Sequence, residues 1–312
     1  MIKGNAVVDD LRNFRRQLLA RGTPYKPLLK LKLWRPLFDI AFDWATIALA
    51  VAAVCVIGWW LAPVAVLLVG NRQRALGNIL HDAAHQNLHR NRALNDAIAG
   101  TLVAPLILTD LASYRRDHLQ HHLMLGDADK DPDHMPAPRN RTVSWLANYA
   151  RNVLSARAWL GSMTGSMGVQ GVAFGAKLYI AAWWVLGMWA LAGVAGWPVA
   201  STFLAIWWAA RGTAFHAITV FREMCDHFGL CAGSIASFTR DVTRGGVWRK
   251  LVHPRNNGYH LTHHLLPAVP YYHLPDAQRL FAQVPMYRNQ GPVFTSYVLG
   301  THPVVSSWRT GI

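Results

Sequence analysis

The sequence has little charge and few cysteines. Only 15% of its 312 residues are charged, against about 25% in soluble domains, whereas 52% are apolar. Its three cysteines include no CxxC pair, which argues against a disulfide framework and against a cysteine-based structural zinc site. Fourteen tryptophans are present, a residue enriched at membrane interfaces. Together these features favour an integral membrane protein with a sizeable soluble part over a soluble or secreted domain.

The N-terminal stretch MIKGNAVVDDLRNFRRQLLARG lacks the apolar segment of a secretory signal peptide. Residues 1–39 carry nine Lys or Arg residues and form a basic leader that we expect to be cytoplasmic. No internal repeat or low-complexity tract is visible. We therefore expect a single membrane domain, with a core at 40–285 and a C-terminal tail at 286–312.

Two long apolar blocks predict two helical hairpins. Residues 44–70 contain no charged residue, and these 27 residues exceed the ~20 that one crossing helix needs. The sequence GWWLAP at 58–63 is suited to a turn at a membrane interface, and AGWPVA at 195–200 splits the second block, 178–220, in the same way. The apolar stretch 97–108 is too short for a crossing and fits an interfacial segment. The predicted crossing helices lie near 44–60, 62–80, 176–195 and 199–220.

The positive charges predict the orientation. Of the 31 Lys and Arg residues, all except Lys177 and Arg211 lie in residues 1–39, 72–157 or 222–309, and none lies in either hairpin turn. The positive-inside rule then places these segments and both termini in the cytoplasm, with four crossings. We expect an all-α bundle in a membrane, such as a bacterial inner membrane, with a cytoplasmic helical cap. The net charge of +15 reflects this topology rather than nucleic-acid binding, because no basic, aromatic-interleaved module is present.

Histidines are clustered in these same cytoplasmic segments. HDAAH follows the second predicted helix, and HLQHH and HLTHH share an internal spacing of three and four residues, which puts each set of imidazoles on one helical face. A further histidine ends the stretch REMCDH. Neutral imidazole is the commonest metal ligand in proteins, so metal binding explains the clusters better than structural roles do. The clustered histidines are His81, His85, His118, His121, His122, His227, His260, His263 and His264.

This number of imidazoles fits two metal ions, because one catalytic ion uses about three or four protein ligands. Ligand type alone leaves Zn, Cu, Fe and Ni open. The Glu-x-x-His motifs of soluble di-iron bundles are absent from these clusters. The residues therefore predict two imidazole-bound metals at the cytoplasmic end of a membrane helix bundle.

We call HDAAH, HLQHH and HLTHH the first, second and third histidine boxes. In this order and between two hydrophobic hairpins, they resemble the boxes of the membrane-bound fatty acid desaturase and hydroxylase family. RQRALGNILHDAAH is similar to the family's entry into its first box, RRDHLQHH with DADKDPD to the second, and YHLTHHLLPAVPYYHLP to the third. The resemblance covers roughly residues 40–285. Many members carry an acid where Thr262 stands, and Glu where Asp226 stands.

The resemblance implies two Fe ions with the eight box histidines as ligands, and His227 matches an additional histidine that many members carry. It implies that O₂ serves as co-substrate and that hydrogen is abstracted from an unactivated C–H bond of a membrane lipid or acyl chain. We expect a separate electron donor, such as a ferredoxin or another small redox protein, because no cytochrome b5-like domain is visible. Residues placed to orient the ligands are His89, Asp82, Asp117, Asp226, Asn256 and Asn257. The remaining histidines, His134, His216, His253, His273 and His302, are expected to be structural.

Several functions compete at this level. Desaturation of a fatty acyl chain is favoured, with hydroxylation or ketolation of a carotenoid, sphingolipid or other hydrocarbon as the alternative. A membrane zinc hydrolase is disfavoured because it needs a general base beside the metal, as in HExxH, whereas the first box reads HDAAH. A metal carrier should place its histidines within the crossing helices, and these lie at or beyond helix ends.

Overall fold

The computed structural model describes residues 6–22, 24–135 and 143–308, so the first five residues of the predicted leader and the last four of the tail lie outside it. Helices dominate this part of the chain, and its strands are two short segments, which confirms the predicted all-α class. The chain divides into two compact units. We call Lys32–Tyr114 with Asn152–Val220 the apolar unit, and Met1–Leu31 with Arg115–Arg151 and Phe221–Ile312 the histidine-rich unit.

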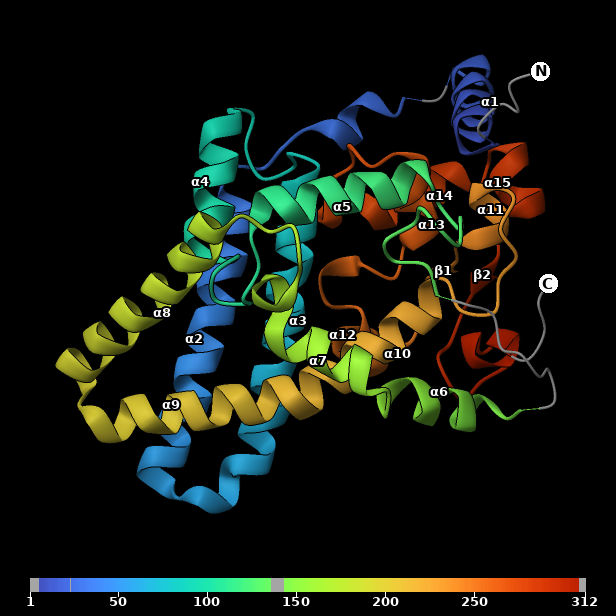
Figure 1. The fold of residues 1–312 in the computed structure, drawn as a ribbon. Coiled ribbons are helices and arrows are strands. Elements are labelled where there is room, and N and C mark those ends of the chain that lie inside the picture. The colour runs from blue at the N-terminus through green and yellow to red at the C-terminus, as the bar shows by residue number, and fades with distance from the viewer. Residues whose placement is uncertain (1–5, 23, 136–142, 309–312) are drawn as a thin grey trace. The chain divides into compact units, whose positions relative to one another are not determined.

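The apolar unit is built around two helical hairpins (Figure 1). Helix α2 (Trp34–Ile57) packs on α3 (Ala62–Ala84), and α8 (Phe174–Ala195) packs on α9 (Trp197–Ala210). Gly58 and Gly196 end the first helix of each hairpin with φ angles of 135° and 86°, which glycine adopts readily. Both turns therefore lie where the sequence predicted them.

Two of the four predicted crossings are long and apolar enough to span a membrane by length and composition, α2 and α8. Helix α3 is long enough but carries polar side chains such as Gln73 and Arg74 in its second half, so its mean hydropathy is lower. Helix α9 ends at Ala210, where a π-helical segment, η4 (Arg211–Phe215), separates it from α10 (His216–Asp226). The four-crossing bundle thus stays a prediction, with α2 and α8 as candidate spans.

Short helices complete the apolar unit. They are η2 (Trp59–Leu61), α4 (Arg92–Leu102), α7 (Ala156–Thr164) and η3 (Gly165–Gly168). The predicted interfacial stretch 97–108 comprises the end of α4 and the turns that follow it. A core of apolar side chains from α2, α3, α4 and α9 holds this unit together, with Ile47, Leu76, Val103 and Trp207 among its most buried members.

The histidine-rich unit consists of short helices and one two-stranded parallel sheet. Its strands, β1 (Asp241–Val242) and β2 (Val293–Phe294), pair in register. Its core includes Phe14 of the N-terminal helix, whose ring meets that of Phe281 edge-on at 4.8 Å. The helices lying wholly in this unit are α1 (Ala6–Ala20), η1 (Lys26–Leu29), α11 (Ile235–Phe238), α12 (Gly246–Val252), η5 (Pro254–Asn256), α13 (His260–Leu265), η6 (Tyr271–His273), α14 (Leu274–Phe281), α15 (Pro285–Gln290) and η7 (Val304–Trp308). The unit boundary falls within α5 (Leu111–Leu123), α6 (Trp145–Val153) and α10.

Candidate metal centre

Two short helices of the histidine-rich unit supply six candidate ligands. The second box lies in the last turns of α5, and the third box forms the first five residues of α13. Because residues three and four apart share a helical face, each helix presents its three imidazoles together. The predicted helical geometry of both boxes is therefore present.

One group of four histidines lies entirely within this unit and is buried throughout. It comprises His121, His227, His260 and His264, each offering one ring nitrogen, and these nitrogens all lie within 4.8 Å of one another. The Nε2 atom of His260 is 2.9 Å from that of His227 and 3.1 Å from that of His264. We call this cluster the four-histidine group.

The outer nitrogens of two of these rings have partners that fix their tautomers. His227 Nδ1 lies 2.8 Å from the carbonyl oxygen of Phe238, which can only accept, so Nδ1 donates and Nε2 keeps its lone pair. His121 Nδ1 lies 2.7 Å from Oδ1 of the buried Asp131. Ligating histidines commonly donate their second N–H to a carbonyl or carboxylate in this way.

Burial favours the neutral form of three of these four rings. Together with the neighbouring His121, it lowers the pKa of His227 to about 3. Burial also holds the pKa values of His260 and His264 well below 6.5, again reinforced by nearby positive groups. Converging ring nitrogens whose lone pairs face one another repel unless a cation lies between them, so this donor set fits a metal ion.

A second set of three histidines lies beside it in the same unit. His118, His122 and His263 place their Nε2 atoms in a row, with 3.1 Å between His118 and His122 and 3.1 Å between His122 and His263. The first box belongs to the apolar unit. His81 lies in the last turn of α3 and His85 caps its end, with ring centroids 5.4 Å apart.

Strand β1 holds the third box in place. Asp241 Oδ1 accepts the backbone N–H of Thr262 at 3.0 Å, and its Oδ2 accepts the hydroxyl groups of Thr262 and Tyr287. Thr262 is fully buried. The Thr262 hydroxyl is therefore turned to this aspartate, which anchors the middle of α13.

Three of the predicted orienting residues lie near the third box. Asp226 is buried, accepts from His253 Nε2 at 3.1 Å and lies 3.8 Å from His260 Nδ1. Asn257 accepts from Arg222 Nε at 2.9 Å. Asn256 donates to the carbonyl of Tyr271 at 3.1 Å, in a left-handed conformation with φ of 60°.

The other three predicted orienting residues have different surroundings. Asp82 is buried, with Oδ1 4.0 Å from His81 Nδ1. Asp117 is 42% exposed at its side chain and pairs with Arg116 at 2.9 Å. His89 lies outside both histidine clusters, and its Nδ1 accepts the backbone N–H of Asn91 at 2.9 Å in the turn before α4.

The histidines expected to be structural also lie outside these clusters. His216 is bonded at both ring nitrogens, to Ser162 Oγ at 2.7 Å and to the carbonyl of Val153 at 2.9 Å. His253 bridges Asp226 and the Tyr297 hydroxyl. Among the contacts of the other three, His134 stacks on Phe238, His273 approaches Asp276 at 3.7 Å, and His302 packs on Phe294.

Sequence reasoning missed two carboxylates. Asp131 lies in the DADKDPD stretch, in which the sequence assigned no role to any residue, yet its side chain is buried and also accepts the backbone N–H groups of Gly126 and Asp133. The acidic run after the second box was a usable signal for it. Asp241 had no such signal, because its partner Thr262 lies 21 residues further along the chain.

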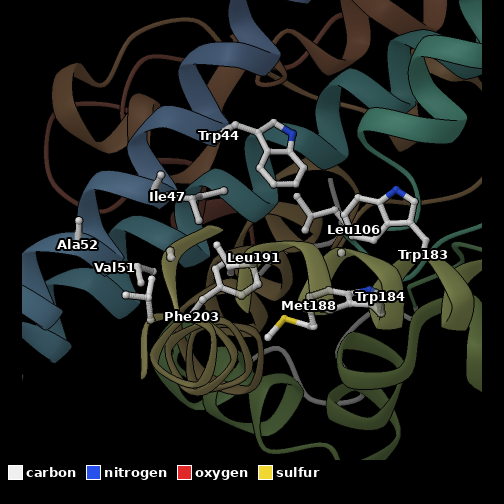
Figure 2. A pocket seen from close by; sticks show the side chains of 14 residues that line it. Trp44, Ile47, Val51, Ala52, Leu106, Trp183, Trp184, Met188, Leu191 and Phe203 are labelled. Atoms are coloured by element: carbon white, nitrogen blue, oxygen red, sulfur yellow. The ribbon is translucent and has the colours of Figure 1, made fainter. Parts of the chain in front are cut away.

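An apolar cavity of about 440 Å³ lies within the apolar unit (Figure 2). Its wall includes Trp44 of α2 and Trp183 and Trp184 of α8. Their indole N–H groups donate to the carbonyls of Leu102, Thr101 and Pro105, so no indole donor is left to face the cavity. Other lining residues are Ile47, Val51, Leu106, Gly187, Met188 and Phe203. The cavity suits hydrocarbon and offers little to a polar group.

Comparison with known proteins agrees with this geometry. The fatty acid desaturase family model matches residues 57–296, a range that contains all nine candidate ligands. The chain is 28% identical over 265 residues to dihydrorhizobitoxine desaturase of Bradyrhizobium elkanii, which covers 80% of this chain and 75% of that enzyme. It is 27% identical over 207 residues to beta-carotene 4-ketolase 3 of Haematococcus lacustris, covering 64% of this chain and 57% of the ketolase. It also matches a probable fatty acid desaturase of Sorghum bicolor at 29% identity over 37% of this chain and 32% of that protein. The relatives are desaturases and a ketolase, which indicates an oxidoreductase, and the chain belongs to the fatty acid desaturase family.

Proposed function

We propose that this protein is a membrane di-iron oxidoreductase that uses O₂ and external electrons to desaturate a fatty acyl or lipid chain. The observation that carries the proposal is the four-histidine group, in which four buried imidazoles bring ring nitrogens within 4.8 Å of one another. This group would hold one iron. The row of His118, His122 and His263 would contribute to the second, completed by His81 and His85 of the first box, because three imidazoles alone leave room for further ligands.

A bound iron pair would supply the means to reduce O₂ to water with two external electrons while two hydrogens leave adjacent carbons of the chain. The protein residues supply position and exclusion of water. Asp131 and the Phe238 carbonyl hold two imidazoles in the ligating tautomer. Asp241 holds α13 through Thr262. Burial of all four rings keeps bulk water from the four-histidine group.

The substrate we propose is an apolar chain. Support comes from the apolar cavity, whose aromatic wall has its polar atoms turned away. The likeness to a beta-carotene ketolase favours a second candidate, oxygen insertion into a carotenoid or another hydrocarbon. In that case one oxygen atom enters the product and the other leaves as water.

Lipid and metabolite profiling of a host with and without the chain tests this proposal. A new double bond supports desaturation, and a new hydroxyl or keto group supports the alternative. His263→Ala should abolish either change, whereas His302→Ala, a histidine outside both clusters, should not. A profile that the wild-type chain leaves unchanged in an aerobic, iron-replete host argues against both reactions.

We further propose that electrons arrive from a separate redox protein that docks on the basic surface near the second box. Arg116 is exposed there, and salt screens such contacts. Arg116→Glu should slow reduction of the metal centre by a purified ferredoxin and weaken the salt dependence of the rate. An unchanged rate and salt profile would remove this surface from consideration.

The proposed topology has four crossings, with both termini and the histidine boxes in the cytoplasm. It is supported by α2 and α8 and by the absence of Lys and Arg from both hairpin turns. A cysteine introduced at Trp60, which is 72% exposed in the first turn, should react with an impermeant thiol reagent from the periplasmic side of intact cells. Labelling only after cell lysis would contradict this orientation.

A further inference from the structure

Arg211 is a buried cation with few partners. Its side chain lies at the start of η4 and is 2% exposed. Nε donates to the Met163 carbonyl at 3.2 Å, and the guanidinium carbon lies 5.0 Å from the ring centroid of Phe215. Nη1 is buried without a hydrogen-bond partner in the described part of the chain. A guanidinium has five N–H donors, so most of its donor capacity is unused.

No carboxylate of the protein compensates this charge. All 16 Asp and Glu residues lie within the described ranges, and none of them forms an ion pair with Arg211. Two buried carboxylates of the same unit pair with other arginines, Asp39 with Arg35 and Asp43 with Arg72, and a third, Asp82, lies beside His81. Buried charges are normally paired, because leaving water without compensation is unfavourable.

Among the described residues, Arg240 is the other arginine buried to this degree, and its contacts are those of a structural residue. Its guanidinium donates to the carbonyls of Met224, Cys225 and Phe228, and so satisfies the C-terminal end of α10. Arg211 makes a single such bond. Capping of a helix end therefore explains Arg240 and leaves Arg211 without an equivalent explanation.

The backbone around Arg211 is unusual on two sides. Arg211 itself opens the π-helical segment, and such segments frequently occur at functional sites. Leu108 adopts a φ of 59°, and its carbonyl accepts the N–H of Ser166. Between them lies Gly165, where a Cβ would come within 2.5 Å of the Leu108 oxygen and 3.3 Å of Arg211 Nη2. Strained backbone of this kind persists where the surroundings over-determine it, as at ligand clamps.

Apolar surface adjoins the arginine. Trp184 of the cavity wall packs on Trp207 and Trp208, in the turn that precedes Arg211. Leu106, another wall residue, lies two positions before Leu108. An anion bound at Arg211 would thus have hydrocarbon-compatible surface next to it.

We propose that Arg211 binds the anionic oxygen group of an amphiphile with an apolar chain, and that this group belongs to the substrate. The planar guanidinium matches a carboxylate or phosphate. The inference rests on the proposed function, which it deepens, because it favours a substrate with an anionic head over an uncharged carotenoid.

Equilibrium binding to the purified full-length chain in a nonionic detergent tests this without turnover. The probes are palmitate, the alcohol of the same chain length, and the lysophosphatidate carrying the same chain. Palmitate should bind about tenfold or more tightly than the alcohol, because charge-assisted hydrogen bonds are stronger than neutral ones. Stronger binding of lysophosphatidate than of palmitate, also dependent on Arg211, would identify a phosphate as the anion.

Arg211→Gln should remove the preference for the charged probes, and Arg157→Gln, the same loss of charge on the exposed surface of α7, should keep it. If the glutamine variant fails to fold, Arg211→Lys should retain a weakened preference. Equal binding of palmitate and the alcohol by the wild type, or an unchanged preference in Arg211→Gln, would overturn the assignment. Because binding is measured directly, loss of iron or of activity would count against the proposed function and not against this site.

Discussion

Replacing Asp131 with Asn tests how the four-histidine group is held. The Asp131 carboxylate accepts from His121 Nδ1 at 2.7 Å, Gly126 N at 2.8 Å and Asp133 N at 2.9 Å. Burial alone would raise the pKa of Asp131. The hydrogen bond and charge of His121 and the two backbone N–H groups together lower it by more, so the pKa lies below 3.8. All three contacts favour the ionised form, and an amide cannot accept at both positions.

The consequence for His121 follows from the donors. In Asp131→Asn, an NH₂ group faces either the Gly126 N–H or the imidazole. In the second case His121 must accept at Nδ1 and carry its hydrogen on Nε2, where it no longer ligates. In the first case a buried donor lies against another donor, which costs about 1–3 kcal/mol. Loss of such a partner weakens metal binding by about 10- to 100-fold, or about 1.4–2.8 kcal/mol.

The assay is iron release to a chelator, followed by elemental analysis of the purified protein. Asp131→Asn should lose one of two irons at about 10- to 100-fold lower chelator concentration than the wild type. Asp129→Asn, an exposed position in the same loop, removes the same charge and should behave as wild type. Equal release from Asp131→Asn and the wild type would refute the role assigned to Asp131.

Three further predictions concern stability and the cavity. Burial raises the pKa of Asp241 to about 6 in the folded protein from 3.8, so folding should lose about 3 kcal/mol as pH rises from about 4 to 6; Asp241→Asn should flatten this dependence of Tm on pH, and parallel wild-type and variant profiles would contradict it. Gly187→Leu, on the cavity wall, should cut retention of a hydrocarbon probe several-fold. The control Gly193→Leu, in the same helix but not on the wall, gives the same gain in helix propensity and should leave retention unchanged. Equal retention by both variants would argue against the cavity as a site for an apolar chain. Asp226→Ala should destabilise the fold by about 3–5 kcal/mol, because the 2.8 Å ion pair with Arg222 is buried, and adding Arg222→Leu should recover part of the lost Tm; a single variant as stable as wild type would show that the pair contributes little.

The periodic features of the sequence predicted the local structure of the site well. The offsets of three and four in the second and third boxes are a direct consequence of helix geometry, so α5 and α13 present those imidazoles on one face as expected. Gly58 and Gly196 likewise marked the hairpin turns through their backbone freedom. His227 could be placed only through the family resemblance, since a lone histidine has no spacing to interpret.

Features that depend on tertiary contacts could not be predicted from the sequence pattern. The buried Asp131 looked like its solvated neighbours, and the link between Asp241 and Thr262 joins a two-residue strand to a helix. Within the apolar block 178–220, Arg211 and Gly212 interrupt the apolar run, but such an interruption does not specify the hydrogen-bond shift of the π-helical segment Arg211–Phe215.

The metal content of the purified chain shows whether the histidines hold a two-iron centre. After aerobic expression in iron-replete medium, elemental analysis should find about two irons per chain, since the histidines form more ligands than one ion uses. His260→Ala should lower that number, and His302→Ala should not. Zinc alone, or one metal per chain unaffected by His260→Ala, would contradict the account.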